Sequence, residues 1–166
     1  MAGMPQKKTA RRFVGIQDAL KEEYKGRTNY WICRPGVVEA EKLQICRATL
    51  PGGEGHNFHT HPELEEVIYV LEGEVEQWVE RECRVLKPGD SAHIPAGLVH
   101  ATFNPTKEDA VILAILSPGV SKGPFMVDVS GEAPWKSLRT RPSRGAAKPR
   151  KTRRKPAAGG RSKRRP

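Results

Sequence analysis

Short apolar runs, each interrupted by glycine or proline, fill the sequence between residues 28 and 116 and constrain the fold more than any other feature. These runs have the length and residue types of β-strands and cover 28–34, 43–50, 66–71, 75–79, 91–94, 100–103 and 111–116. Turn signals such as 51–53 and 87–90 separate them. Many short strands with regular turns predict an antiparallel sandwich or barrel, so we expect an all-β fold.

Four potential metal ligands lie within this strand-rich segment, namely His59, His61, Glu66 and His100. Imidazole nitrogen and carboxylate oxygen are donors that suit Zn, Mn, Fe, Ni or Cu. His59 and His61 are separated by one residue, which places both side chains on one face of a β-strand. The sequence therefore predicts a strand-borne site for one divalent metal ion of undetermined identity.

The N-terminal part has a different pattern. Apolar residues recur at helical spacing over 13–25, which predicts one short N-terminal helix. Residues 1–12 are polar and basic and are expected to form a flexible leader. We expect one domain over 13–135, in which several large apolar residues of 117–135 form an ordered C-terminal extension laid across the barrel.

Charge divides the chain into two parts. The whole chain of 166 residues has a net charge of +10, but residues 1–135 contain 15 basic and all 19 acidic residues, a net charge of −4. The other 14 basic residues lie in 136–166, which has no acidic residue. This Lys/Arg-rich tail cannot bury enough apolar surface to offset its ordering entropy, so we expect disorder. A solvated tail is the favoured interpretation, with weak non-specific nucleic-acid contact through 136–166 as the alternative.

Cysteine content and hydropathy bear on the cellular compartment. The chain has three cysteines and no CxxC pair, which predicts reduced thiols and a cytoplasmic location. No apolar run approaches membrane-spanning length, so we expect no membrane partner.

The order and spacing of the four ligands resemble those of the cupin superfamily. The first cupin motif, G-x5-H-x-H-x4-E-x6-G, is matched by Gly53, His59, His61, Glu66 and Gly73. The second, G-x5-P-x-G-x2-H-x3-N, is matched by Gly89, Pro95, Gly97, His100 and Asn104. The chain is thus identified as a small single-domain metal-binding cupin. The resemblance implies a double-stranded β-helix, or jelly roll, that holds the metal in its barrel and forms a homodimer. A scaffold that has lost its metal is disfavoured because all four ligands are intact.

Other polar residues near the motifs have alternative interpretations. Glu65 competes with Glu66 as the carboxylate ligand, but the motif spacing favours Glu66. His56 is offset by an odd number of residues from His59, so a regular strand would point it away, and we interpret it as a surface histidine. For His93 a structural role is favoured over a place in the pocket. The large aromatic residues are interpreted as core, namely Tyr30, Trp31, Phe58, Trp78 and Phe103.

The expected ligand set suggests a small-molecule function. Three imidazoles and one carboxylate leave an octahedral ion with positions for water or substrate, where the ion can act as a Lewis acid or, with Fe(II), activate dioxygen. Our preferred prediction is a dioxygenase-type oxidoreductase. The alternatives are a metal-dependent isomerase or decarboxylase on a sugar or organic acid, and a non-catalytic small-molecule or metal sensor. No residue outside the ligand set stands out as a catalytic acid or base.

Overall fold

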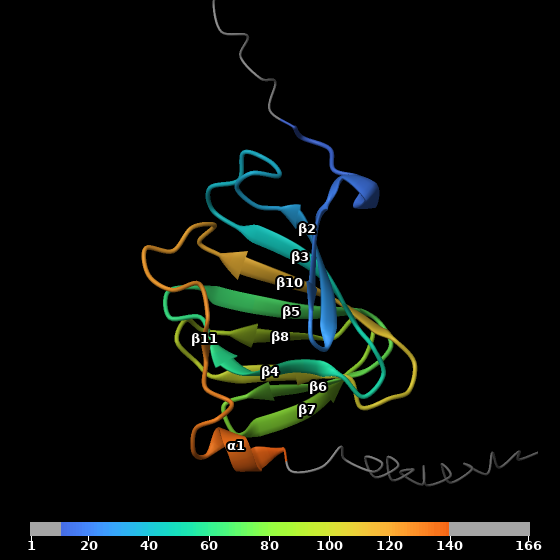
Figure 1. Cartoon of the computed structure of the whole chain (residues 1–166), viewed down its shortest axis with the longest axis vertical. Coiled ribbons are helices and arrows are strands. Elements are labelled where there is room, and N and C mark those ends of the chain that lie inside the picture. Colours follow the sequence, from blue (N-terminus) through green and yellow to red (C-terminus); the bar gives the residue numbers. More distant parts are fainter. Residues whose placement is uncertain (1–10, 140–166) are drawn as a thin grey trace, which may run out of the picture.

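Two antiparallel β-sheets form a jelly-roll barrel in the computed structural model, which describes residues 11–139 (Figure 1). One sheet has the strand order β1-β2-β3-β10-β5-β8 and the other β11-β4-β9-β6-β7. The strands are β1 (Leu20–Tyr24), β2 (Arg27–Cys33), β3 (Gln44–Leu50), β4 (Gly55–Thr60), β5 (Glu65–Glu72), β6 (Val75–Val79), β7 (Glu82–Leu86), β8 (Ser91–Ile94), β9 (His100–Phe103), β10 (Ala110–Ser117) and β11 (Val127–Asp128). A 3-10 turn, η1 (Ile16–Asp18), and a short helix, α1 (Trp135–Leu138), complete the described elements.

The predicted all-β fold is confirmed, and each predicted strand is present with ends that agree within one residue. The structure adds β1, β4, β7 and β11, which the apolar pattern did not indicate. These strands are short or rich in polar residues; β1, for example, reads LKEEY. They form because neighbouring strands supply their backbone hydrogen bonds, which an apolar pattern within one segment does not report.

The helix predicted over residues 13–25 is wrong. Only η1 is helical in this range, and β1 follows it as an antiparallel partner of β2. A turn at Gly26, whose φ is +88°, joins the two strands, with Tyr24 opposite Arg27. A short helix is marginal unless its apolar stripe packs on another surface, whereas the β2 edge offers ready backbone partners.

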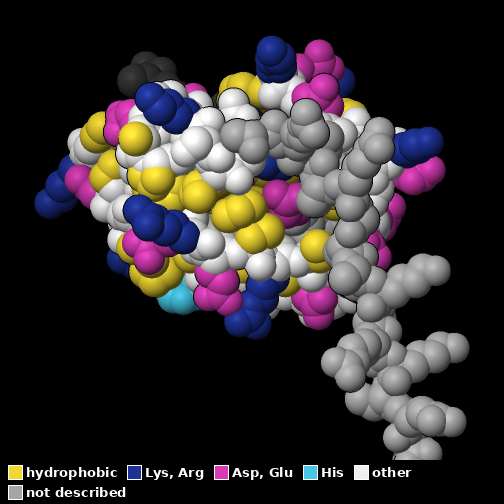
Figure 2. Space-filling model, turned by 90° about the horizontal axis from the view of Figure 1, so that it is seen from below, with side chains coloured by type: hydrophobic (Ala, Val, Ile, Leu, Met, Phe, Trp, Pro, Cys, Tyr) yellow, Lys and Arg dark blue, Asp and Glu magenta, His cyan; other side chains and the backbone are white. Residues whose placement is uncertain are grey.

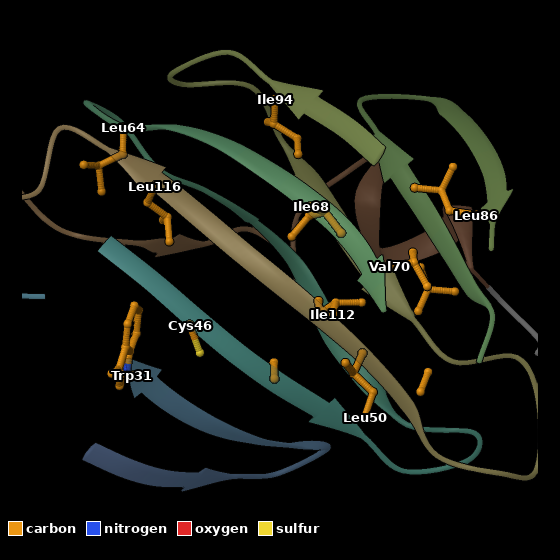
Figure 3. Packing of buried hydrophobic residues seen from close by; sticks show 13 residues of the cluster. Trp31, Cys46, Leu50, Leu64, Ile68, Val70, Leu86, Ile94, Ile112 and Leu116 are labelled. Carbon is orange, nitrogen blue, oxygen red and sulfur yellow. The ribbon is translucent and has the colours of Figure 1, made fainter. Parts of the chain in front are cut away.

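A hydrophobic cluster fills much of the space between the sheets (Figure 3). The residues of β3 alternate between buried and half-buried, so one face of this strand points into the barrel. The buried members of the cluster are Trp31, Cys46, Ala48, Leu50, Leu64, Ile68, Val70, Val75, Leu86, Ile94, Ala110, Ile112 and Leu116.

The C-terminal extension lies against the five-stranded sheet. Its strand β11 pairs with β4. Trp135 of α1 stacks on Phe58 with 5.7 Å between ring centroids, and Leu138 packs against the same cluster. The chain thus continues in contact with the barrel slightly beyond the expected domain boundary at residue 135.

The surface at the α1 and β7 end carries acidic and basic side chains interspersed with apolar ones (Figure 2). Among residues 11–139, no helix is both long and apolar enough to cross a bilayer. Most of the predicted leader and tail, residues 1–10 and 140–166, lies outside the described residues.

Candidate metal centre

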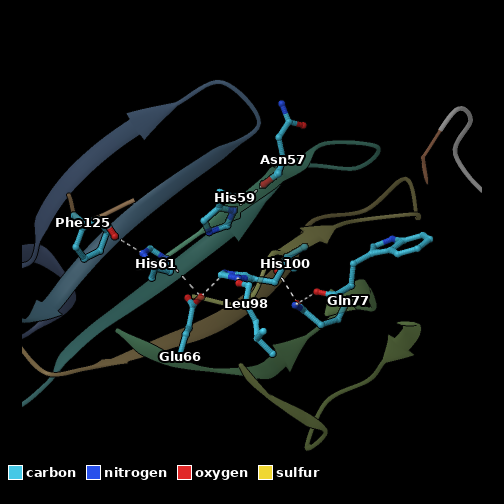
Figure 4. A network of polar contacts seen from close by, with 10 residues as sticks. Asn57, His59, His61, Glu66, Gln77, Leu98, His100 and Phe125 are labelled. Atoms are coloured by element: carbon cyan, nitrogen blue, oxygen red, sulfur yellow. Dashed lines mark hydrogen bonds and ion pairs between the residues drawn. The ribbon is translucent and has the colours of Figure 1, made fainter. Parts of the chain in front are cut away.

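The four residues predicted as metal ligands come together inside the barrel (Figure 4). One ligand atom from each of His59, His61, Glu66 and His100 lies within 4.8 Å of the other three. Their exposed fractions are 3%, 4%, 5% and 1%, respectively. Four polar side chains buried this deeply form a single cluster rather than separate surface sites.

Strand pairing explains this convergence. His59 of β4 lies directly opposite His100, the first residue of β9. His61 follows β4, two residues after His59. Glu66 belongs to β5 in the six-stranded sheet and faces these histidines across the barrel. The cluster therefore requires both sheets to be in place.

Each imidazole is held at its Nδ1 atom by a backbone carbonyl. The Nδ1–O distances are 2.7 Å for His59 to Asn57, 2.5 Å for His61 to Phe125 and 3.1 Å for His100 to Leu98. A carbonyl oxygen only accepts hydrogen bonds, so these contacts favour the tautomer that carries its proton on Nδ1. The Nε2 lone pairs are then free to bind a cation, as metal-ligating histidines commonly do.

Two donor atoms of the cluster lack a hydrogen-bond partner. Glu66 Oε2 lies 2.7 Å from His100 Nε2 and 3.6 Å from His61 Nε2. Despite the short distance, the Glu66–His100 contact does not have hydrogen-bond alignment, and both atoms are buried without a partner. Buried polar atoms of this kind are costly unless something pairs with them. A cation among the four donors would satisfy both atoms, so the residues fit a divalent metal ion.

Burial disfavours the charged form of every member of the cluster, but it prevails only at His59 and His61. It lowers the pKa of His59 well below the ordinary value, with help from His56 and His100, and it also lowers the pKa of His61. Burial opposes the charged form of His100 as well, but the nearby Glu66 outweighs this effect and raises the pKa of His100. The pKa of Glu66 is lowered because the histidines favour its carboxylate more strongly than burial disfavours it. A bound cation would pair with the Glu66 carboxylate and with the neutral imidazoles.

A cavity of about 130 Å³ adjoins the four ligands. Most of its wall belongs to the six-stranded sheet and is apolar, comprising Trp31, Cys46, Ala48, Leu50, Ile68, Ile112, Ala114 and Leu116. Phe125 and Met126 of the C-terminal extension also line it. An apolar cavity of roughly 150 Å³ accommodates benzene, so this one suits a ligand of similar size or smaller.

The interpretation of His56 as a surface histidine is wrong. His56 lines the cavity, and its ring stacks on that of His59 with 3.8 Å between centroids. The alternation of a regular strand would separate the two side chains, but the pairing of β4 with β9 shifts register between them. Such an irregularity re-aims side chains, and nothing in the local sequence announces it.

The remaining polar residues near the motifs point elsewhere. Glu65 lies on the outer face and contacts His93 at 3.0 Å, and both side chains are exposed to more than half. The structure thus places Glu66, not Glu65, in the cluster and His93 outside the cavity. Trp31 belongs to the core as expected but also lines the cavity. Sequence reasoning missed other polar residues of the cavity wall, and nothing in the motif pattern signals them; they are Tyr24, Arg27, Asn29 and Thr102.

Comparisons with known proteins agree with this architecture. Residues 46–116 match the family model described as Cupin domain. An uncharacterized protein of Aquifex aeolicus is 47% identical over 60 residues, which are 36% of this chain and 49% of that protein. The polyketide synthase CurC of Streptomyces cyaneus is 29% identical over 123 residues, which are 74% of this chain and 79% of that protein.

A solved structure shows the same fold. The polyketide cyclase RemF from Streptomyces resistomycificus has a TM-score of 0.63 at 18% identity, covering 77% of this chain and 98% of RemF. The matched region spans about half the length of the Aquifex relative. The family match covers the segment that contains all four candidate ligands. It follows that residues 46–116 of this chain form a cupin domain.

Proposed function

We propose that the protein binds one divalent metal ion through His59, His61, Glu66 and His100 and is an enzyme that acts on a small molecule in the adjoining cavity. The observation that carries this proposal is the convergence of four buried donors, two of them without a hydrogen-bond partner. Three neutral nitrogens and one carboxylate leave positions on the ion for a substrate oxygen. The cavity beside them has room for such a substrate.

The proposed reaction class is a dioxygenase-type oxidation. Fe(II) in a histidine and carboxylate site supplies open positions at which dioxygen and substrate can meet. The chain itself orients the ligands, because the carbonyls of Asn57, Phe125 and Leu98 fix the three imidazole rings. Apolar residues of the cavity wall lie beside these ligands, where a bound substrate would replace water.

A redox-neutral reaction is the second candidate. It is favoured by the relative named polyketide synthase CurC, which aligns over most of both chains. A metal that acts only as a Lewis acid would suffice for cyclisation, isomerisation or decarboxylation.

Metal substitution distinguishes these candidates. The protein is loaded with Fe(II), Mn(II) or Zn(II) and assayed for oxygen uptake and product formation with small phenols and 2-oxo acids. Oxygen uptake that requires Fe(II) supports the oxidation. Turnover by the Zn(II) form without oxygen uptake supports the redox-neutral reaction. Tight ligand binding without turnover by any form would overturn the enzyme proposal in favour of a sensor.

We also propose that the protein forms a homodimer. Strand β1 is an outer strand of the six-stranded sheet, and apolar side chains on or near it are exposed, including Phe13, Ile16 and Leu20. A second copy that covers this edge would bury them. Light scattering on the purified protein tests this proposal, and a monomeric mass would contradict it.

A further inference from the structure

The inner face of β2 carries two polar side chains beside the apolar residues that the six-stranded sheet contributes to the cavity wall. Arg27, Asn29 and Trp31 alternate along the strand and all line the cavity. The neighbouring strand presents Cys46 and Ala48 to the same space. A cation and an amide at these positions are not needed to pack the barrel.

Asn29 is buried without satisfying its hydrogen-bonding capacity. Its exposed fraction is 7%, and its Oδ1 atom is buried with no hydrogen-bond partner. Buried amides nearly always bond to protein or to a bound molecule. The Asn29 Nδ2 group also makes no hydrogen bond among residues 11–139. As a donor it can pair with an acceptor on a ligand in the cavity, whereas Oδ1 would need a donor.

Arg27 is half-buried and has no carboxylate within ion-pair distance among residues 11–139. Its guanidinium lies over the Tyr24 ring, 4.5 Å from the centroid. Other half-buried arginines each have a glutamate partner, at 3.6 Å for Arg34 with Glu22, 3.9 Å for Arg47 with Glu72 and 3.2 Å for Arg139 with Glu76. Arginine keeps its charge in proteins, so this one is available to an anion that enters the cavity.

The hairpin that precedes Arg27 holds it beside the metal-ligand strand. A Cβ atom on Gly26 would lie 2.5 Å from the Gly55 carbonyl oxygen, so the hairpin tip packs tightly against the start of β4. β4 also carries His59. Arg27 and the four candidate ligands thus line one cavity from strands of both sheets.

We propose that Arg27 and Asn29 form a subsite that holds the carboxylate of a small organic acid, while another oxygen of the same molecule reaches the metal. This inference rests on the proposed function and names its substrate class. Guanidinium binds carboxylate through two parallel N–H···O bonds, and the Asn29 Nδ2 group donates a further hydrogen bond to the carboxylate. The size of the cavity limits the acid to a short carbon skeleton. A neutral apolar ligand would leave both polar groups unpaired.

The test compares an acid with its uncharged amide. Pyruvate and pyruvamide are titrated by calorimetry into Mn(II)-loaded and metal-free protein. We expect pyruvate to bind at least about tenfold more tightly than pyruvamide to the loaded form, since a charge-assisted hydrogen bond contributes that much. Arg27→Gln should weaken pyruvate binding about 10- to 100-fold, and the near-isosteric Asn29→Leu about threefold to tenfold, with pyruvamide binding little changed.

The matched control is Arg47→Gln, which removes a positive charge from the opposite face of the same sheet. It should leave both affinities unchanged, and elemental analysis should find equal metal in all three variants. Equal affinity for pyruvate and pyruvamide, no saturable pyruvate binding, or an Arg27→Gln protein that behaves like Arg47→Gln would overturn the subsite.

The two proposals fail in distinguishable ways. If the protein binds the acid selectively but no metal form converts it, the subsite proposal stands and the enzyme proposal is wrong. If the protein converts neutral substrates and does not bind the acid more tightly, the enzyme proposal stands and the subsite proposal is wrong. If the protein takes up no metal, the proposed function is wrong. The affinities of the metal-free protein for pyruvate and pyruvamide then test the subsite alone.

Discussion

Two regions of the barrel interior are equally buried but chemically opposite. In the packed region, Val70 and Val75 are 0% exposed and Leu86 is 8% exposed, and all three contact other apolar residues. In the ligand region, the four candidate metal ligands are 1–5% exposed, yet all are polar or charged. Burial favours the first region directly, whereas the second is costly unless its donors are paired. The contrast shows where this fold gains stability and where it accepts a cost for chemistry.

Replacing metal-binding side chains should have the largest effect, which is a loss of metal affinity. In the double variant His59→Ala, His100→Ala we expect metal affinity to fall by several orders of magnitude, because half of the donor set is lost. Elemental analysis of the purified variant beside the unmodified protein measures this loss. Equal metal content in the two proteins would show that the ion binds elsewhere.

Truncating the packed region should change stability without changing chemistry. Leu86→Ala leaves a cavity between the sheets and should lower the free energy of unfolding by about 2–5 kcal/mol. Denaturant titration measures the loss. Leu86 does not line the cavity beside the ligands, so the folded variant should keep its metal content. A variant that loses metal at unchanged stability would contradict the division into two regions.

Of the two regions, acid should destabilise the ligand region, because the packed region holds no titratable side chain among those compared. The pKa values of His56, His59 and His61 are lowered from 6.5 by burial, so the unfolded chain takes up protons below about pH 6.5 that the folded, metal-free chain does not. Their contribution to stability is therefore lost as the pH falls. His100 acts in the opposite sense, because its raised pKa gives a contribution that is full at low pH and is lost as the pH rises through that pKa.

Since three histidines oppose one, we expect the metal-free protein to lose stability as the pH falls below about 6.5, by about 1.4 kcal/mol per pH unit for each net proton taken up on unfolding. Denaturant titrations in a chelator at several pH values measure this slope. Leu86→Ala serves as the control and should give a parallel curve at lower stability. A pH-independent stability would mean that the histidines do not stay neutral when buried.

The smallest effect on stability is expected from weakening the contact between the C-terminal extension and the ligand region. Glu63 accepts hydrogen bonds from the backbone N–H of Lys122 at 2.7 Å and of Gly123 at 3.1 Å. Glu63→Gln weakens these bonds and should cost about 1 kcal/mol or less, because the site is exposed. Faster amide hydrogen exchange at residues 122–125 is the expected signal. Glu65→Gln, an outward-facing control, should leave this exchange unchanged, and equal rates in both variants would contradict the role of Glu63.

Local patterns predicted much of the fold because strand length, turn residues and apolar content are properties of single segments. They found β2, β3, β5, β6, β8, β9 and β10. They failed at the N-terminus, where helical spacing over 13–25 predicted a helix but residues 20–24 form a strand paired with β2. Propensity is a weak predictor where a neighbouring strand offers hydrogen bonds, and such pairing is not written in the segment itself.

The sequence by itself determined which four side chains meet, because donor type and motif spacing already identify His59, His61, Glu66 and His100. Only the tertiary structure decided their surroundings. The Phe125 carbonyl reaches His61 from 64 residues away, a register shift turns His56 inward, and a hairpin brings Arg27 into the cavity. These placements depend on contacts between segments distant in the chain, and a linear motif records only the residues that one segment contributes.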